Sequence, residues 1–200
     1  TGTVNLNNGT PLASNLGTIT VKGTSNFGMI AKGSGTGTIA TAINANILDI
    51  SGGSSVGMYS TADGLVNNSS AITVSGGNSI GMYTTTGSAN ANSGTIIVTG
   101  LKSAGVYNTG KFTMSSGSIT ATNSGIAVYA DGAASNTSIA GNVTVGNGST
   151  AFYGNNGAVI TLNNTAINVN NGGLLYYRGG TTGSLSGTAT ATIASGATAF

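Results

Sequence analysis

Apolar and polar residues alternate along most of the chain with a period of two, which is the spacing of a half-buried β-strand. The apolar runs are short, are separated by Gly, Asn, Ser and Thr, and nowhere sustain a helical period of 3.6 residues. One run, residues 79–83 (SIGMY), recurs along the chain. Its Met position falls at residues 29, 58, 82, 106, 128, 152, 176 and 200, at spacings of 29, 24, 24, 22, 24, 24 and 24 residues. A period this regular indicates a repeat architecture.

Each repeat contains three strand-like segments. An apolar-x-apolar strand, such as 72–74 (ITV), lies about ten residues before the Met position, and a weaker strand, such as 111–114 (KFTM), follows in the next arc. Turns rich in Gly and Asn, such as 75–78 (SGGN), tolerate positive φ and allow sharp bends. Three strands and three turns per repeat describe one coil of a parallel β-helix, and the crossover rule favours the right hand. We therefore predict an all-β fold, a right-handed parallel β-helix (β-solenoid) with about 24 residues per coil and about eight coils.

The repeats predict a single β-solenoid segment over residues 1–200, in which 1–16 form an irregular first coil. Residues 31–41 form the longest insertion, account for the first spacing, and are expected in a surface loop. The repeat runs to both ends without caps, so we interpret the chain as a fragment of a longer repeat protein.

Strand residues two apart share a face, so the run around Met82 predicts which columns point inward. The columns of Ile80 and Met82 are expected to stack in the core, and those of Gly81 and Tyr83 to face outward. The predicted core column is Met29, Met58, Met82, Val106, Val128, Phe152, Tyr176 and Phe200. The predicted outer column is Tyr59, Tyr83, Tyr107, Tyr129, Tyr153 and Tyr177.

Three interpretations of the Tyr column remain open. The favoured one is a stacking ladder that stiffens the sheet, and the second is an exposed aromatic strip that contacts a receptor or a glycan. In the third, the phase is inverted and both the Gly and the Tyr columns lie inside.

Two polar columns are predicted as well. Outward Thr residues on the first strand, such as Thr73 and Thr144, resemble the arrays of ice-binding β-helices, but Ile97 and Asn168 interrupt the array. An Asn recurs four residues before an Ile anchor, and stacked amides can bond along a turn. The predicted Asn ladder is Asn15, Asn68, Asn92 and Asn163.

The composition is poor in reactive groups. Gly accounts for 35 residues, Lys and Arg together for 5, Asp and Glu for 3, and there is no His, Cys or Trp. The net charge of +2 reflects few acids and no basic patch, so nucleic-acid binding is not expected. Without Cys or His, disulfides, Cys-ligated metals and a Ser-His-Asp triad are excluded. No apolar run reaches the ~18–20 residues of a membrane-spanning helix.

The three acids are dispersed. Asp63 and Asp131 each precede a Gly and are interpreted as turn residues, and Asp49 as an outward strand residue. No catalytic site can be assembled from them. We therefore expect a protein that is not an enzyme and needs no cofactor or metal.

Residues 71–83 (AITVSGGNSIGMY) and 94–107 carry the pattern G-[ST]-I-x-V-x-G-x-x-S-x-G-M-Y. This pattern resembles the passenger-domain repeats of type V autotransporter adhesins of fusobacterial type, over roughly residues 17–200. The resemblance implies a surface-exposed stalk translocated through an outer-membrane β-barrel.

The expected function is the structural and adhesive shaft of a bacterial cell-surface passenger. Its partner would be a protein or glycan on a host or another bacterial cell, and its location extracellular, at the bacterial surface. The alternative is a self-assembling filament or surface-layer subunit with end-to-end association. An ice-binding or carbohydrate-active β-helix is less favoured.

Overall fold

The computed structural model describes residues 4–6, 12–179 and 183–200, and side chains from residue 12 onward. Every regular element in these ranges is a β-strand, and every pairing between them is parallel. The strands form three ladders, because each coil of the chain contributes one strand to each ladder.

Sheet 1 is the first ladder and contains the strands that carry the Met and Tyr columns. Its strands are β1 (Val4–Leu6), β4 (Phe27–Lys32), β7 (Val56–Thr61), β10 (Ile80–Thr84), β13 (Ala104–Asn108), β16 (Ile126–Asp131), β19 (Thr150–Asn155) and β21 (Leu174–Gly179).

The other two ladders form one folded sheet of 14 strands. Ladder 2 contains β2 (Leu12–Asn15), β5 (Thr41–Asn44), β8 (Leu65–Asn68), β11 (Ala89–Asn92), β14 (Lys111–Met114) and β17 (Asn136–Ile139). Ladder 3 contains β3 (Ile19–Val21), β6 (Leu48–Ile50), β9 (Ala71–Val74), β12 (Thr95–Val98), β15 (Ser118–Ala121) and β18 (Asn142–Val145). The long strand β20 (Val159–Val169) pairs with both β17 and β18, and β22 (Ser184–Ile193) pairs with β20.

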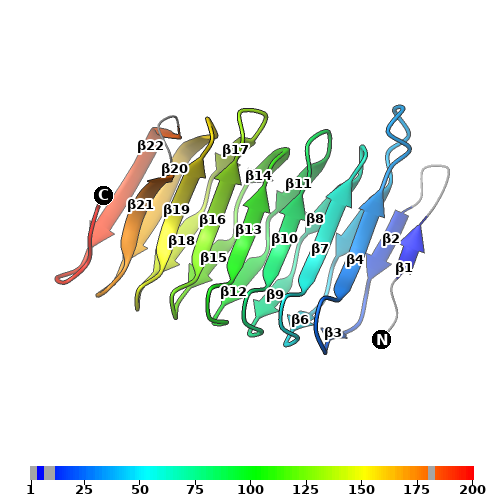
Figure 1. The fold of residues 1–200 in the computed structure, drawn as a ribbon, viewed down its shortest axis with the longest axis horizontal. Helices are drawn as coiled ribbons and strands as arrows, with labels where there is room; N and C mark the ends of the chain where they lie inside the picture. Colours follow the sequence, from blue (N-terminus) through cyan, green and yellow to red (C-terminus); the bar gives the residue numbers. More distant parts are fainter. Residues whose placement is uncertain (1–3, 7–11, 180–182) are drawn as a thin grey trace.

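The predicted β-solenoid is confirmed. In Figure 1 the strands of sheet 1 run upward in front, the return strands lie behind, and the chain advances from right to left, which is a right-handed coil. The Met position pairs from Met29 to Tyr176 through six steps of 29, 24, 24, 22, 24 and 24 residues. The structure thus has about six turns, slightly fewer than the eight coils expected, because the strands at either end belong to partial coils.

The core column of sheet 1 faces ladders 2 and 3. Met58, Met82 and Phe152 are fully buried, and Met29 and Tyr176 are 4% and 9% exposed. The two Val positions, 106 and 128, are also buried. Phe200 departs from the expectation, since it is 82% exposed and no further coil covers it.

The prediction that the Ile80 column points inward and the Gly81 column outward is wrong. Ile80 pairs with Ala104 and Met82 with Val106, while Gly81 is skipped in the register. A Cβ on Gly81 would lie 3.3 Å from the Ile96 methyl in the core and 2.6 Å from the carbonyl oxygen of Gly105. Gly81 and Met82 therefore both point inward, which interrupts the alternation of the strand, and Ile80 faces outward. Glycine permits this close approach because it has no Cβ.

The Asn ladder is present with a different membership. Amide nitrogens donate to the next amide oxygen from Asn15 to Asn44 (2.8 Å), from Asn44 to Asn68 (2.8 Å) and from Asn68 to Asn92 (2.7 Å). The sequence prediction missed Asn44. It also included Asn163 wrongly, because that residue lies one position beyond the column, is exposed and donates to Ser138.

Candidate recognition surface

The six Tyr residues of the predicted outer column stand side by side on the solvent face of sheet 1. Five are half-buried, and Tyr177 is 49% exposed. Ring centroids of successive Tyr lie 4.5–5.2 Å apart. Phe27 belongs to the neighbouring Ile80 position of the coil before, and its ring lies 5.4 Å from that of Tyr59. The arrangement is both a stacking ladder and a solvent-exposed aromatic strip. The third interpretation, in which the Tyr column points into the core, is wrong.

Ring orientation changes along the row. The rings are tilted by 51° between Tyr59 and Tyr83, and meet edge to face at 71–75° from Tyr83 to Tyr153. Tyr153 and Tyr177 are stacked at 27°. Edge-to-face and offset contacts between aromatic rings contribute about 0.5–1.5 kcal/mol beyond area burial. The ladder thus supports the sheet while one side of each ring remains available to solvent.

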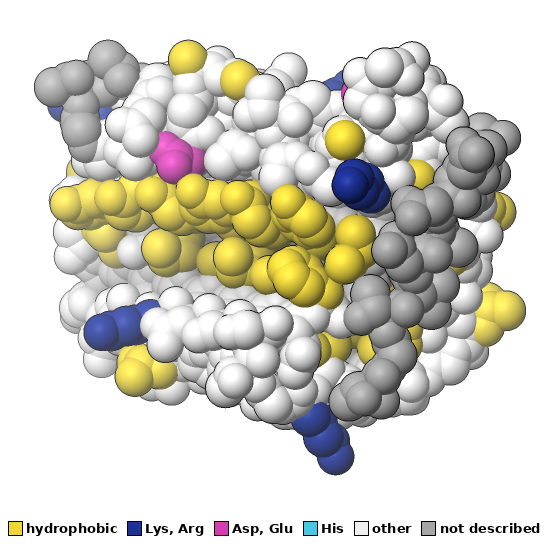
Figure 2. Space-filling view, turned by 45° about the vertical axis from the view of Figure 1, so that its right-hand side comes forward, with side chains coloured by type: hydrophobic (Ala, Val, Ile, Leu, Met, Phe, Trp, Pro, Cys, Tyr) yellow, Lys and Arg dark blue, Asp and Glu magenta, His cyan; other side chains and the backbone are white. Residues whose placement is uncertain are grey.

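A second apolar row runs beside the Tyr column. It contains the residues at the Ile80 position, of which Phe27 is 40% exposed, Ile80, Ile126 and Leu174 are half-buried, and Val56 and Ala104 are buried. Figure 2 shows both rows in yellow along one side of the rod. We call the two rows together the Tyr face. Gly81, Met82 and their equivalents separate the two rows along each strand and point into the core. The side chains of the two rows therefore lie next to each other on the surface and form a wide apolar strip.

Asp131 is the one carboxylate of the described residues that contacts the Tyr column. The Tyr107 hydroxyl donates to its Oδ2 (3.0 Å). The side-chain amides of Asn155 and Asn156 donate to Oδ1 (3.2 and 2.8 Å), and Asn155 also donates to the Tyr129 hydroxyl (3.4 Å). The sequence assigned Asp131 to a turn, but it ends strand β16, and only Gly132 behind it adopts a turn φ of 84°. Because Asp131 belongs to the strand that pairs with the Tyr107 strand, its carboxylate lies within reach of the Tyr107 hydroxyl. The Asp-Gly motif suggested a turn instead, so the sequence analysis missed this contact.

This network changes the acidity of the neighbouring phenols. Burial and the hydrogen bond to Asp131 raise the pKa of Tyr107 well above its ordinary value. Burial, the neighbouring Tyr59 and the charge of Asp131 raise the pKa of Tyr83. The pKa of Tyr129 is raised by burial and by Asp131, although the hydrogen bond from Asn155 opposes the change. All three phenols therefore stay protonated, and can donate hydrogen bonds, throughout the physiological pH range.

The remaining acids lie elsewhere. Asp49 faces outward from β6, as expected, and Asp63 sits in the turn before β8 with a φ of 64°. No group of three or more His, Cys, Asp or Glu that could hold a metal ion occurs within the described ranges. No helix in this part of the structure is long and apolar enough to span a membrane.

The outward Thr column on ladder 3 is interrupted in the structure as well. Asp49 pairs beside Thr73, and Ile97 and Asn168 stand in the same column. This surface therefore lacks the continuous hydroxyl array that ice binding requires.

Comparison with known proteins adds no relative: no family model, no curated protein and no solved structure matches the chain.

Proposed function

We propose that this chain is part of the structural and adhesive shaft of a bacterial cell-surface protein, with the Tyr face as its contact surface. The observation that supports this proposal is the length of the Tyr face. An aromatic strip on six successive coils, at roughly 4.8 Å per coil, extends about 24 Å along a rod.

The rod itself supports a mechanical role. Each coil bonds its backbone to the coils before and after it, so only the end coils present unpaired strand edges. The core is filled coil by coil, and nearest-neighbour contacts of this kind give solenoids their stiffness. Such a rod holds an adhesive surface away from its point of attachment.

The partner and the location follow from the same proposal. An uncharged aromatic strip with protonated phenols suits the apolar faces and hydroxyl groups of a protein or glycan on another cell. The resemblance of the repeats to autotransporter passengers supports a location outside the bacterial cell for the proposed shaft.

The test uses beads coated with the folded chain and applied to epithelial cells and to bacteria. Beads carrying the folded chain are expected to adhere, and beads carrying the heat-unfolded chain are expected to lose adhesion. If folded and uncoated beads bind equally, the adhesive function is wrong.

A self-assembling filament is the second candidate. Its support is the pairing of the strands: each described coil bonds its backbone to its neighbours through parallel ladders, and the same pairing can join coils of separate copies. Electron microscopy of the concentrated chain distinguishes the two candidates, because filaments would favour assembly and separate short rods the shaft.

A further inference from the structure

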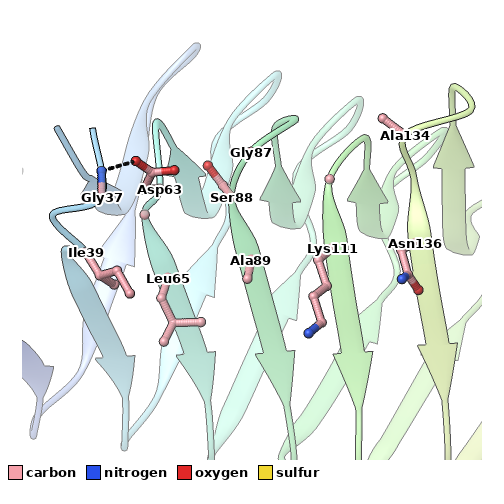
Figure 3. Close-up of a pocket in the computed structure, with 12 residues that line it drawn as sticks. Gly37, Ile39, Asp63, Leu65, Gly87, Ser88, Ala89, Lys111, Ala134 and Asn136 are labelled. Carbon is pink, nitrogen blue, oxygen red and sulfur yellow. Dashed lines mark hydrogen bonds between the residues drawn. The ribbon is translucent and has the colours of Figure 1, made fainter. Parts of the chain in front are cut away.

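A groove crosses ladder 2, on the sheet next to the Tyr face. It encloses about 510 Å³ and runs across the strands, parallel to the rod. Figure 3 shows the side chains of its floor, one from each successive coil: Ile39, Leu65, Ala89, Lys111 and Asn136. The turns that contain Gly37, Asp63, Gly87 and Ala134 form its upper wall.

The insertion predicted at residues 31–41 is a loop over 33–40 only, because its first two residues extend β4 and its last begins β5, and this loop builds one end of the groove. It is held by its own hydrogen bonds, since the Ser34 hydroxyl accepts from the backbone N–H groups of Thr36 (3.2 Å) and Thr38 (3.1 Å). The carboxylate of Asp63 accepts from the N–H of Gly37 (3.1 Å), which joins the loop to the next coil. The ordered loop leaves Ile39 48% exposed at the end of the groove. The longest insertion in the repeat thus creates a hollow that the regular coils lack.

Chemical character changes along the groove. Leu65 and Ala89 form an aliphatic floor, and at Gly87 an added Cβ would meet nothing within 4 Å, so the wall is open there. Asp63 lies at one end, while the exposed Lys111 and Asn136 lie at the other, two and three coils further on. From Leu65 to Asn136 the floor spans three strand spacings, roughly 14 Å.

We propose that this groove binds an anionic oligosaccharide of about three or four sugar units. Extended pyranose chains repeat at a distance close to the strand spacing, so that successive rings match successive coils. The C–H faces of the rings pack on Leu65 and Ala89, and the carboxylate or sulfate of the sugar pairs with Lys111. Hydroxyl groups bond to the Asn136 amide and to the free lone pairs of Asp63. This site is separate from the Tyr face, so its binding of a sugar does not depend on the adhesive function proposed for the Tyr face.

An extended peptide fits this groove less well. Peptides that lie on sheets gain affinity by bonding their backbone to a free strand edge. The floor strands β8, β11 and β14 are each paired on both sides, so no such edge is available. A peptide there would leave its own amide groups without partners, which costs binding free energy. The polar groups of an oligosaccharide stand around the edges of its rings, where the side chains of Asp63, Lys111 and Asn136 reach some of them.

The test titrates the purified chain with a hyaluronan tetrasaccharide, which carries carboxylates, and with uncharged chitotetraose. Hyaluronan is expected to bind more tightly. Ala89→Glu places a bulky anion in the middle of the floor and is expected to abolish binding. Its matched control is Ala91→Glu, two residues along the same strand on the same outward face but outside the groove, which is expected to bind like the unaltered chain.

Lys111→Gln keeps a long polar side chain and removes its charge. Loss of one charge-assisted bond is expected to weaken hyaluronan binding about tenfold and to leave chitotetraose unaffected. Lys102→Gln, in an exposed turn outside the groove, is the control. The proposal is overturned if Ala89→Glu and Ala91→Glu behave alike, if Lys111→Gln binds hyaluronan normally, or if only acidic peptides bind.

Discussion

Met82 and Tyr83 are neighbours in the sequence and lie on opposite sides of the same sheet. Their columns differ in which side chains they contain. The inner column accepts Met, Val, Phe and Tyr in successive coils, and nearly all of these residues are buried. The outer column carries Tyr in six consecutive coils. A core requires apolar volume of about the right size, which several side chains supply. An aromatic row requires a ring in every coil, and at Tyr107 the hydroxyl adds a hydrogen bond to Asp131 that Phe could not make.

The largest expected effect is on the inner column. Met82→Ala removes a fully buried side chain and leaves a cavity in the coil, so the free energy of unfolding should fall by about 2–5 kcal/mol. Urea unfolding followed by circular dichroism measures it. Thr73→Ala, on the outward face of β9, is the control and should change little. A loss below about 1 kcal/mol would show that the coil collapses around the missing side chain.

Asn68→Ala should have the next largest effect. It removes the amide that accepts from Asn44 and donates to Asn92, and leaves both of these buried amides short of a partner. The expected loss in the free energy of unfolding is about 2–3 kcal/mol. Asn67→Ala, the outward neighbour on β8, is the matched control. Equal losses in the two variants would mean that the ladder contributes no more than strand propensity.

The pH dependence tests the Asp131 network. The pKa of Tyr107 is raised in the folded protein, so the folded state holds this proton more tightly than the unfolded state does. The resulting stability is fully present below the ordinary Tyr pKa of about 10 and is lost as the pH rises above it. Asp131→Asn should lower the pKa values of Tyr83, Tyr107 and Tyr129 in a phenolate absorbance titration, and Asp49→Asn should not. Unchanged titration in Asp131→Asn would contradict the network.

The smallest effect on stability is expected for Tyr83→Phe and Tyr153→Phe. Neither hydroxyl makes a hydrogen bond to another described side chain, and the ring contacts remain, so each change should cost less than about 0.5 kcal/mol in urea unfolding. Tyr107→Phe, which removes the bond to Asp131, should cost more. The same cost at all three positions would show that Asp131 does not strengthen the ladder.

The sequence predicted most of the fold because a solenoid repeats its local pattern. The spacing of the Met position predicted the length of one coil. Period-two alternation predicted which residues of ladders 2 and 3 point inward, such as Ile72 and Phe112. Alternation failed at Gly81, where two successive positions point inward. Such an interruption leaves no mark in the pattern beyond the glycine itself.

Only half of the proposed contact surface could be predicted from the sequence. The Tyr column could be predicted, but the outward turn of the Ile80 column, which widens the strip, could not. Asp131 was hidden by its Asp-Gly motif, since its contact with Tyr107 depends on one coil lying directly on another. The groove on ladder 2 was missed for a similar reason. Its floor draws single residues from successive coils, and its end wall comes from an insertion whose folded shape the sequence does not reveal.

The most direct test of the account is the adhesion of Tyr83→Lys/Tyr153→Lys on beads, measured beside its urea unfolding. The two lysines place charge on the Tyr face without touching the inner column. The account predicts that adhesion is lost while circular dichroism shows a chain that is still folded under the assay conditions, with an unfolding midpoint lowered by the lost ring contacts. Adhesion that persists in this variant would contradict the account and leave the Tyr column a purely structural ladder.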